Sequence, residues 1–264
     1  MTDSRGMVSS SVVKKRFLSV GSVTLSLEEQ EAYRRRYAVE NPGWRPASHV
    51  YRDRLAAYLT SNTRVLDLGC GRGGVMEELY PRAALPVGLD PDLVSLQEYR
   101  APAIRRVCGR GGSLPYRDGA FDLVCCSWVL EHLLDPGPVF AEVVRVLGAG
   151  GHFVFLTPNR GHPLLMLNRL LRWTRGRLVD RLYGRDEVDT FPALYRANTP
   201  GQIEQLAQAV GLKRVSLRLI GDPTYLAFND GLFRLACLLE RVTPRQMRVH
   251  LVGEYVAVDR RPLK

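Results

Sequence analysis

The chain contains Thr63-Arg-Val-Leu-Asp-Leu-Gly-Cys-Gly-Arg-Gly-Gly74, a short apolar segment that runs into a glycine-rich turn. Residues 65–68 are apolar except for Asp67, as in a parallel strand that is buried on both faces. The glycines that follow tolerate positive φ angles and let backbone N–H groups approach a ligand closely. We predict a helix from Gly74 to Tyr80 that directs its positive end at the same loop. The stretch therefore predicts a nucleotide-binding turn.

Two ligand classes compete for this turn. The spacing Gly69-x-Gly71-x-x-Gly74, with Asp90 about 20 residues further on, satisfies the dinucleotide fingerprint, in which an acid binds the ribose. Asp67, however, lies two residues before the first glycine, where a carboxylate suits a cationic ligand better than a pyrophosphate. S-adenosylmethionine (AdoMet) carries a sulfonium and an ammonium group and no phosphate. We therefore predict AdoMet rather than NAD.

Further motifs follow the glycine loop in order. They are Gly88-Leu-Asp-Pro91, Leu114-Pro-Tyr-Arg-Asp-Gly-Ala-Phe-Asp-Leu-Val-Cys-Cys-Ser-Trp-Val-Leu-Glu-His132 and Arg145-Val-Leu-Gly-Ala-Gly-Gly151. With the glycine loop they resemble the class I AdoMet-dependent methyltransferases, in particular the small-molecule branch, over residues 50–160. The resemblance implies an α/β, Rossmann-like, doubly wound sheet of seven mainly parallel strands whose last strand is antiparallel. It also implies an N-terminal helical lid.

The chain is expected to form one domain, residues 26–264, after a flexible tail at 1–25. A capping box at Ser26-Leu-Glu-Glu29 predicts the first of two leading helices within residues 26–60. Their aromatic residues are candidates for a lid, although packing is the simpler role. Residues 162–196 are predicted to form an inserted cover over the substrate site, because an insertion after the fifth strand lies over the cleft. The aromatic residues in question are Tyr33, Tyr37, Trp44 and Tyr51.

The resemblance implies the residues that bind AdoMet. Asp90 would accept the ribose hydroxyls, Pro91 would pack beside adenine, and backbone groups at Cys126 and Ser127 would meet the methionine part. Arg110 stands where the family usually has an acid for the adenine amino group, so this contact would come from the backbone near Gly111 or from Asp92. The predicted cofactor-binding set is Asp67, Gly69, Gly71, Gly73, Asp90, Pro91, Gly111, Cys126 and Ser127.

The predicted substrate side follows the fourth and fifth strands. His132 is a candidate general base, since histidine titrates near neutral pH, but a structural hydrogen bond at a helix start would also explain it. Arg196 is a candidate anchor for an anionic substrate. The predicted substrate-binding set is Trp128, His132, Asn159, His162, Tyr195 and Arg196. Too few acids are clustered to predict a metal site.

Charge and cysteine content indicate which binding partners and which cellular compartment to expect. The net charge is +10, but the basic residues are dispersed, so we expect neither a nucleic-acid partner nor membrane contact. Five cysteines without a C-x-x-C spacing and the lack of a transmembrane or signal segment favour a reduced cytoplasm. We expect AdoMet-dependent methyl transfer to oxygen or nitrogen of a small molecule, with S-adenosylhomocysteine as product. A nucleic-acid or lipid methyltransferase and a non-catalytic AdoMet-binding protein remain alternatives.

Overall fold

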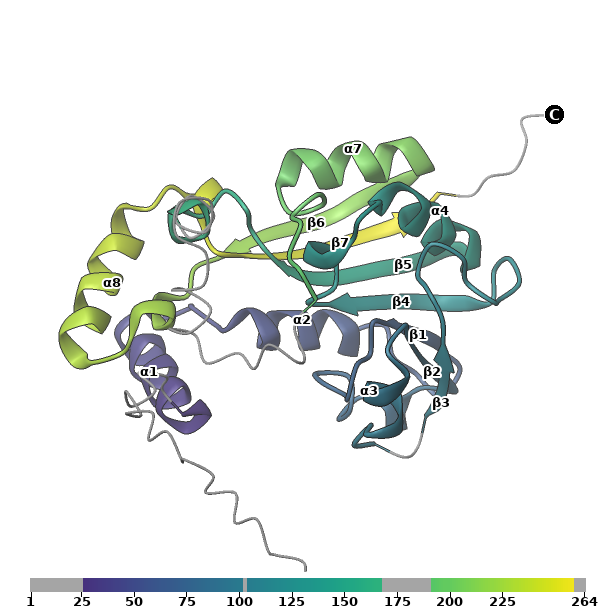
Figure 1. Cartoon of the computed structure of the whole chain (residues 1–264), viewed down its shortest axis with the longest axis horizontal. Coiled ribbons are helices and arrows are strands. Elements are labelled where there is room, and N and C mark those ends of the chain that lie inside the picture. The colour runs from purple at the N-terminus through teal and green to yellow at the C-terminus, as the bar shows by residue number, and fades with distance from the viewer. Residues whose placement is uncertain (1–25, 102–103, 168–190, 259–264) are drawn as a thin grey trace, which may run out of the picture.

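The computed structural model describes residues 26–101, 104–167 and 191–258. The predicted tail and most of the predicted cover lie outside these residues. The described chain forms a seven-stranded sheet in the order β3-β2-β1-β4-β5-β7-β6 (Figure 1). The strands are β1 (Arg64–Leu68), β2 (Leu85–Asp90), β3 (Arg105–Cys108), β4 (Phe121–Ser127), β5 (Leu147–Pro158), β6 (Leu212–Ile220) and β7 (His250–Ala257).

The strand directions confirm the predicted doubly wound sheet. Strands β1 to β5 pair in parallel, whereas β7 enters between β5 and β6 and is antiparallel to both. The carboxyl ends of the first six strands therefore meet at one edge of the sheet, where β7 begins. The strand order reverses between β1 and β4, which is where ligands bind in open sheets of this kind.

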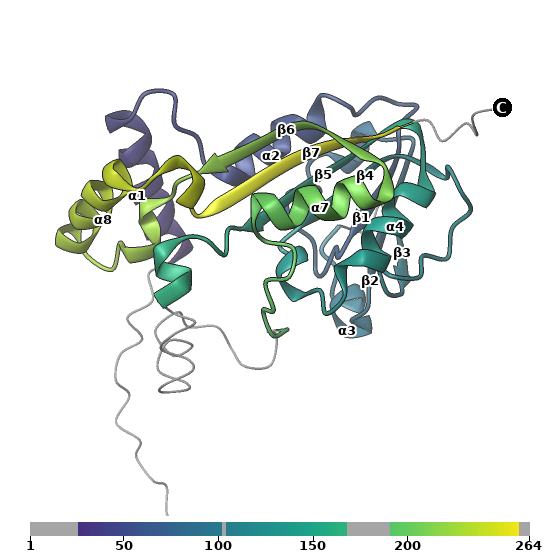
Figure 2. The same ribbon diagram turned by 90° about the horizontal axis from the view of Figure 1, so that it is seen from above.

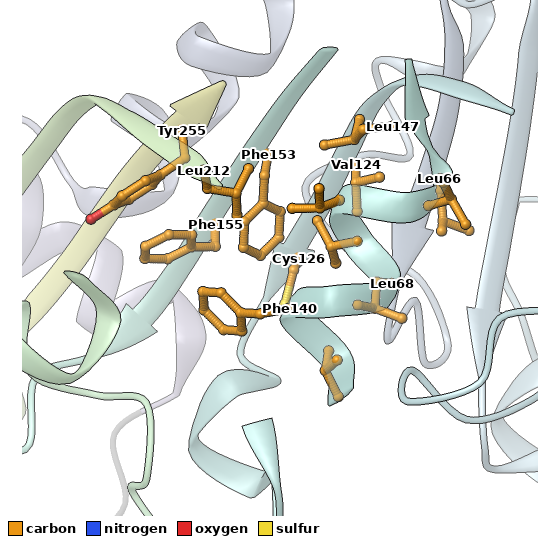
Figure 3. Packing of buried hydrophobic residues seen from close by; sticks show 14 of the residues in the cluster. Leu66, Leu68, Val124, Cys126, Phe140, Leu147, Phe153, Phe155, Leu212 and Tyr255 are labelled. Atoms are coloured by element: carbon orange, nitrogen blue, oxygen red, sulfur yellow. The ribbon is translucent and has the colours of Figure 1, made fainter. Parts of the chain in front are cut away.

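The central strands β1, β4, β5 and β7 divide their side chains between two cores. Leu66 and Leu68 of β1 face the larger cluster, together with Phe153 and Phe155 of β5, whereas Val65 faces the second cluster on the other side. Figure 3 shows the larger cluster, in which Phe140 lies among the β4 and β5 side chains. Alternation along strands that are buried on both faces produces this division. The apolar run that was read as a buried strand is therefore confirmed.

Helices cover both faces. Helices α4 (Pro136–Val146) and α7 (Pro200–Val210) contribute to the larger cluster, and α2 (Ala47–Ala56) contributes to the second. The short helix α3 (Leu93–Gln97) follows β2. Helix α1 (Leu27–Glu40) begins with the predicted capping box, since the side chains of Ser26 and Glu29 each accept the other residue's backbone N–H.

A helical extension lies beyond the carboxyl ends of β5 and β6. The chain leaves β6 through the 3₁₀ turn η4 (Pro223–Leu226), forms α8 (Asp230–Val242) and returns through η5 (Arg245–Met247). Helix α1 packs against α8, with the Tyr33 and Phe233 ring centroids 4.6 Å apart (Figures 1 and 2). Tyr37 and Trp44 also form a ring pair, and Tyr51 is fully buried. Packing is therefore the role of these aromatic residues.

The predicted helix from Gly74 to Tyr80 is wrong. Residues 75–79 form turns and not a helix, and the 3₁₀ turn η1 (Tyr80–Arg82) follows them. Two adjacent glycines and Pro81 disfavour a helix here, because glycine costs backbone entropy and proline lacks an N–H. The glycine-rich residues 148–151 belong to the start of β5, which shifts register against β4 between Phe121 and Leu123.

Candidate functional site

The site lies at the carboxyl edge where β1, β2 and β4 end. Gly69 follows β1, Asp90 ends β2 and Ser127 ends β4. Strands β1 and β4 pair directly, so the loops that follow them are neighbours. The structure therefore brings together the predicted glycine loop, the predicted ribose acid and the start of the predicted substrate side.

The glycine loop needs its glycines for both conformation and space. Gly69, Gly71 and Gly73 have φ angles of 75°, 50° and 108°. A Cβ at Gly69 would lie 2.2 Å from Cγ2 of Val129, in the loop after β4, whereas a Cβ at Gly71 would have no heavy atom within 4 Å. The glycine loop is thus packed against the Val129 side chain at Gly69, whereas the space beside Gly71 is open.

Asp90 holds this loop at the end of β2. Its Oδ2 accepts the backbone N–H of Gly71 at 2.9 Å, and its Oδ1 accepts the backbone N–H of Asp92 at 2.8 Å. The residue is 7% exposed. A carboxylate offers about four lone-pair sites, so each oxygen retains capacity for one hydroxyl donor. These two acceptor oxygens fit the two vicinal hydroxyls of a ribose.

Asp67 is buried beneath the loop. Its Oδ2 accepts the hydroxyl of Tyr80 at 2.5 Å, and its Oδ1 accepts the thiol of Cys125 at 3.6 Å. Tyr99 donates in turn to Tyr80 at 2.7 Å. Burial raises the pKa of the Asp67 carboxyl to about 6. Its charge at neutral pH lies under the loop, which favours a cationic ligand above it.

The predicted adenine side is less defined. Asp92 caps α3, since its carboxylate accepts the backbone N–H groups of Val94 and Ser95 at 3.2 and 3.1 Å. Arg110 and Pro91 are exposed, and Gly111 is backed by Leu68, with which an added Cβ would be in contact at 3.3 Å. Because Asp92 is used as a cap, backbone groups near Gly111 are the better candidates for adenine recognition.

Trp128 marks the substrate side. It has a φ of 59°, which is rare outside glycine, and it is 41% exposed. Its ring packs edge-on against His250, with centroids 5.3 Å apart. Cys126, two residues earlier, is fully buried, so only its backbone can contribute to the site. Trp128 therefore lies between the predicted methionine-binding strand end and His250.

Two buried histidines lie behind Trp128, and sequence reasoning identified only one of them. His250 is 4% exposed and its Nε2 lies 2.8 Å from the Tyr225 hydroxyl, while His162 is 7% exposed. Burial lowers the pKa of each imidazole to about 4, and each also has a buried Nδ1 that has no hydrogen-bond partner among the described residues. This region thus contains neutral imidazoles and a tyrosine hydroxyl as buried or partly buried polar groups.

Glu131, also missed, joins His132 to the far end of the predicted cover. Its backbone oxygen accepts the N–H groups of Leu194 and Tyr195 at 2.6 and 3.0 Å, and its Oε2 accepts the Thr157 hydroxyl at 3.0 Å. His132 Nδ1 lies 3.4 Å from the Pro192 oxygen, and the His132 side chain is 25% exposed. The structure thus places His132 beside the segment that contains Tyr195.

The other predicted substrate residues have separate environments. Arg196 is exposed and donates to the Leu134 oxygen at 2.7 Å. Asn159 has no exposed surface, and its amide donates to the backbone oxygens of Gln246 and Arg248 at 2.9 and 2.8 Å. The amide of Asn159 therefore joins the end of β5 to the approach to β7, which leaves it unsuited to substrate contact.

Other features of the described residues lie outside this site. Residues 26–101, 104–167 and 191–258 contain no group of three or more potential metal ligands and no helix with the length and hydropathy of a bilayer span. A cavity of about 400 Å³ opens at the opposite, amino-terminal edge of the sheet, beside Thr63, Asp122 and His152. It is remote from the glycine loop, so the loop and Asp90 define the candidate site.

Comparisons with known proteins agree with this geometry. Residues 66–155 match the profile of the methyltransferase domain family. A probable S-adenosylmethionine-dependent methyltransferase from Mycolicibacterium smegmatis is 36% identical over 125 residues, 47% of this chain and 48% of its own length. A malonyl-[acyl-carrier protein] O-methyltransferase from a Marinomonas species is 33% identical over 121 residues, 42% of this chain and 45% of its own length.

The fold is also similar to that of a solved methyltransferase. A crystal structure of geranyl diphosphate C-methyltransferase from Streptomyces coelicolor superposes with a TM-score of 0.56, at 14% identity, over 80% of this chain and 77% of that one. The chain spans about half the length of the curated relatives it matches. With the motifs, the sheet order and the glycine loop, these matches identify residues 66–155 as a methyltransferase domain and make the chain similar to AdoMet-dependent methyltransferases.

Proposed function

We propose that this chain transfers a methyl group from AdoMet to an oxygen or nitrogen of a small-molecule acceptor. The observation that carries the proposal is the pairing of Asp90 with the glycine loop at the reversal point of the sheet. AdoMet supplies an electrophilic methyl group on a sulfonium, and S-adenosylhomocysteine is the product. Methyl transfer is an in-line displacement, so the protein's main task is to align the reactants and exclude water.

Three residues at the ends of β1 and β2 would bind the cofactor, each in a different way. Asp90 would accept the ribose hydroxyls, and the open space at Gly71 would admit the ligand close to the backbone. Asp67, buried beneath the loop, would favour the cationic cofactor over its neutral product. Because Asp67 is already bonded to Tyr80, its contribution would be electrostatic and not a direct contact.

The acceptor would bind against Trp128, between the β4 end and the segment that follows Pro192. His132 would take the proton of a hydroxyl acceptor as its oxygen attacks the methyl carbon, or the proton of an ammonium acceptor before its nitrogen attacks. The bond between the methyl carbon and the sulfonium sulfur breaks as the new bond forms, and S-adenosylhomocysteine is the leaving group. His162 and His250, which are buried and have lowered pKa values, would supply neutral polar groups and not a proton acceptor near neutral pH. Arg196, on the surface, would suit an anionic acceptor.

An acceptor screen tests the proposal. The protein is incubated with AdoMet and a panel of phenols, hydroxy acids, amines and thioester-linked acids, and S-adenosylhomocysteine is quantified together with the methylated acceptor. The proposal expects both products in equal amounts with at least one acceptor, and a raised KM for that acceptor in Tyr195→Phe or Arg196→Gln at unchanged AdoMet affinity. Tight AdoMet binding without turnover across the panel would instead favour the non-catalytic alternative.

A further inference from the structure

Helix α8 carries an apolar stripe on the side that faces solvent. Its inward side is formed by Phe233, Ala236 and Glu240, which are 1%, 6% and 9% exposed. The opposite side consists of residues at helical spacing, which places them in one row. They are Leu232, Leu235, Leu238, Leu239 and Val242, with exposures of 38%, 48%, 57%, 46% and 76%. A surface helix of a folded domain normally presents the reverse arrangement.

The charge beside this stripe is positive. Arg234, Arg241 and Arg245 are exposed, and none of them forms an ion pair with another described residue. The two acids of the helix are already used: Asp230 pairs with Arg36 at 3.0 Å, and Glu240 is buried 3.7 Å from Arg248. On the adjacent α1, Glu40 and Glu31 pair with Arg36 and Arg34. The surface around the stripe is therefore apolar with unneutralised arginines.

We propose that the outer face of α8 docks on an anionic lipid surface. An apolar helix face flanked by arginines binds at the headgroup boundary through buried apolar area and attraction to anionic lipids. A second copy of the chain fits less well. A helix of 13 residues is about 20 Å long and about 10 Å wide, which supplies much less than the ~800 Å² per partner of a stable interface.

The position of α8 determines which edge of the sheet would face the bilayer. The helix belongs to the excursion between the carboxyl end of β6 and the start of β7, at the same edge of the sheet as His250 (Figures 1 and 2). Docking through α8 would therefore bring the edge that carries the candidate site toward the bilayer. The proposal concerns the surface alone and does not depend on methyl transfer.

Vesicle flotation tests the proposal with the full chain. Vesicles of phosphatidylglycerol and phosphatidylcholine are compared with vesicles of phosphatidylcholine alone. The expected result is flotation with the anionic vesicles, weakened by about tenfold or more in the double variant Leu238→Ser, Val242→Ser. Arg234→Gln with Arg241→Gln should weaken flotation and reduce its salt dependence.

Two controls keep the test decisive. Val215→Ser with Val258→Ser removes similarly exposed apolar side chains on β6 and after β7, 50% and 51% exposed, and should float like the wild type. Melting temperatures should match in all variants. Failure of the wild type to float, or equal flotation of the Leu238 and Val242 variant, would overturn the proposal. A wild-type dimer in light scattering that the same variant abolishes would assign the stripe to a second copy and also overturn it.

Discussion

Asp90 accepts the backbone N–H of Gly71 at 2.9 Å, so the acid proposed to meet the ribose also fixes the loop beside it. The second carboxylate oxygen is bonded to the backbone N–H of Asp92 at 2.8 Å. A single side chain thus joins the loop after β1 to the turn after β2. The proposed ribose contact would therefore couple ligand binding to the conformation of the loop.

Asp90→Ala should weaken S-adenosylhomocysteine binding by roughly 1–3 kcal/mol, because charge-assisted hydrogen bonds to the ligand and to the loop are lost together. Calorimetric titration measures the change. Asp92→Ala is the matched control: it removes the cap of α3, costs about 1 kcal/mol of stability and should leave ligand affinity nearly unchanged. An unchanged affinity in Asp90→Ala would place the ribose acid elsewhere.

Gly69→Ala should destabilise the fold by roughly 2–4 kcal/mol, through the strain of a positive φ and the clash with Val129. Gly71→Ala meets no atom within 4 Å and should lose only the conformational part, about 1 kcal/mol. Urea unfolding separates the two. Adding Val129→Ala to Gly69→Ala should recover part of the loss; strict additivity of the two substitutions would show that the clash is absent.

His132→Ala should lower kcat by about 10²–10⁴-fold if His132 is the general base. The wild-type kcat should then rise with pH through one ionisation, and the variant should lack this limb. An amine acceptor titrates as well, so both proteins are compared with the same acceptor. A pH limb that persists in the variant assigns the ionisation to the substrate or to another residue.

His250 should make the protein sensitive to acid. Its pKa is lowered to about 4, chiefly by burial and secondarily by Arg34 and His162, while Asp222 acts in the opposite direction. The unfolded chain therefore binds more protons between pH 6.5 and pH 4, and stability falls as the pH falls through this range. The raised pKa of Asp67 opposes the effect below about pH 6, since that carboxyl takes up its proton first in the folded state.

His250→Gln isolates the contribution of this imidazole. The free energy of unfolding, measured in urea at pH 7 and pH 5, should fall less with acid in the variant than in the wild type. His152→Gln, whose imidazole is on the opposite edge of the sheet and less deeply buried, should change the slope less. If the free energy of unfolding falls equally between pH 7 and pH 5 in the wild type and in His250→Gln, then His250 is not buried as a neutral group.

The sequence was most informative where a local pattern dictates one structure. The apolar run at 65–68, the glycine spacing and the capping box at Ser26 each depend on neighbouring residues alone, and all three are confirmed. The predicted helix at 74–80 failed because the tandem glycines and Pro81 outweigh the apolar residues between them. Local propensity was thus a better guide there than the expected order of elements.

What the sequence did not reveal depends on distant residues. His250 meets Trp128 and Tyr225 only because β7 enters the sheet in the reverse direction, so the spacing of these residues in the sequence carries no signal. Glu131 likewise holds the β4 loop in place through Thr157 and through the backbone of Leu194 and Tyr195, which lie more than 60 residues away in the sequence. Helical periodicity also cannot say that Phe233 of α8, and not its row of leucines, faces inward.

The most direct test of the central claim is a melting-temperature measurement with S-adenosylhomocysteine and with NAD. A ligand that binds only the folded chain raises the melting temperature by mass action. We predict a rise with S-adenosylhomocysteine that increases with its concentration and is strongly reduced in Asp90→Ala, and no rise with NAD. A rise with NAD and none with S-adenosylhomocysteine would contradict it.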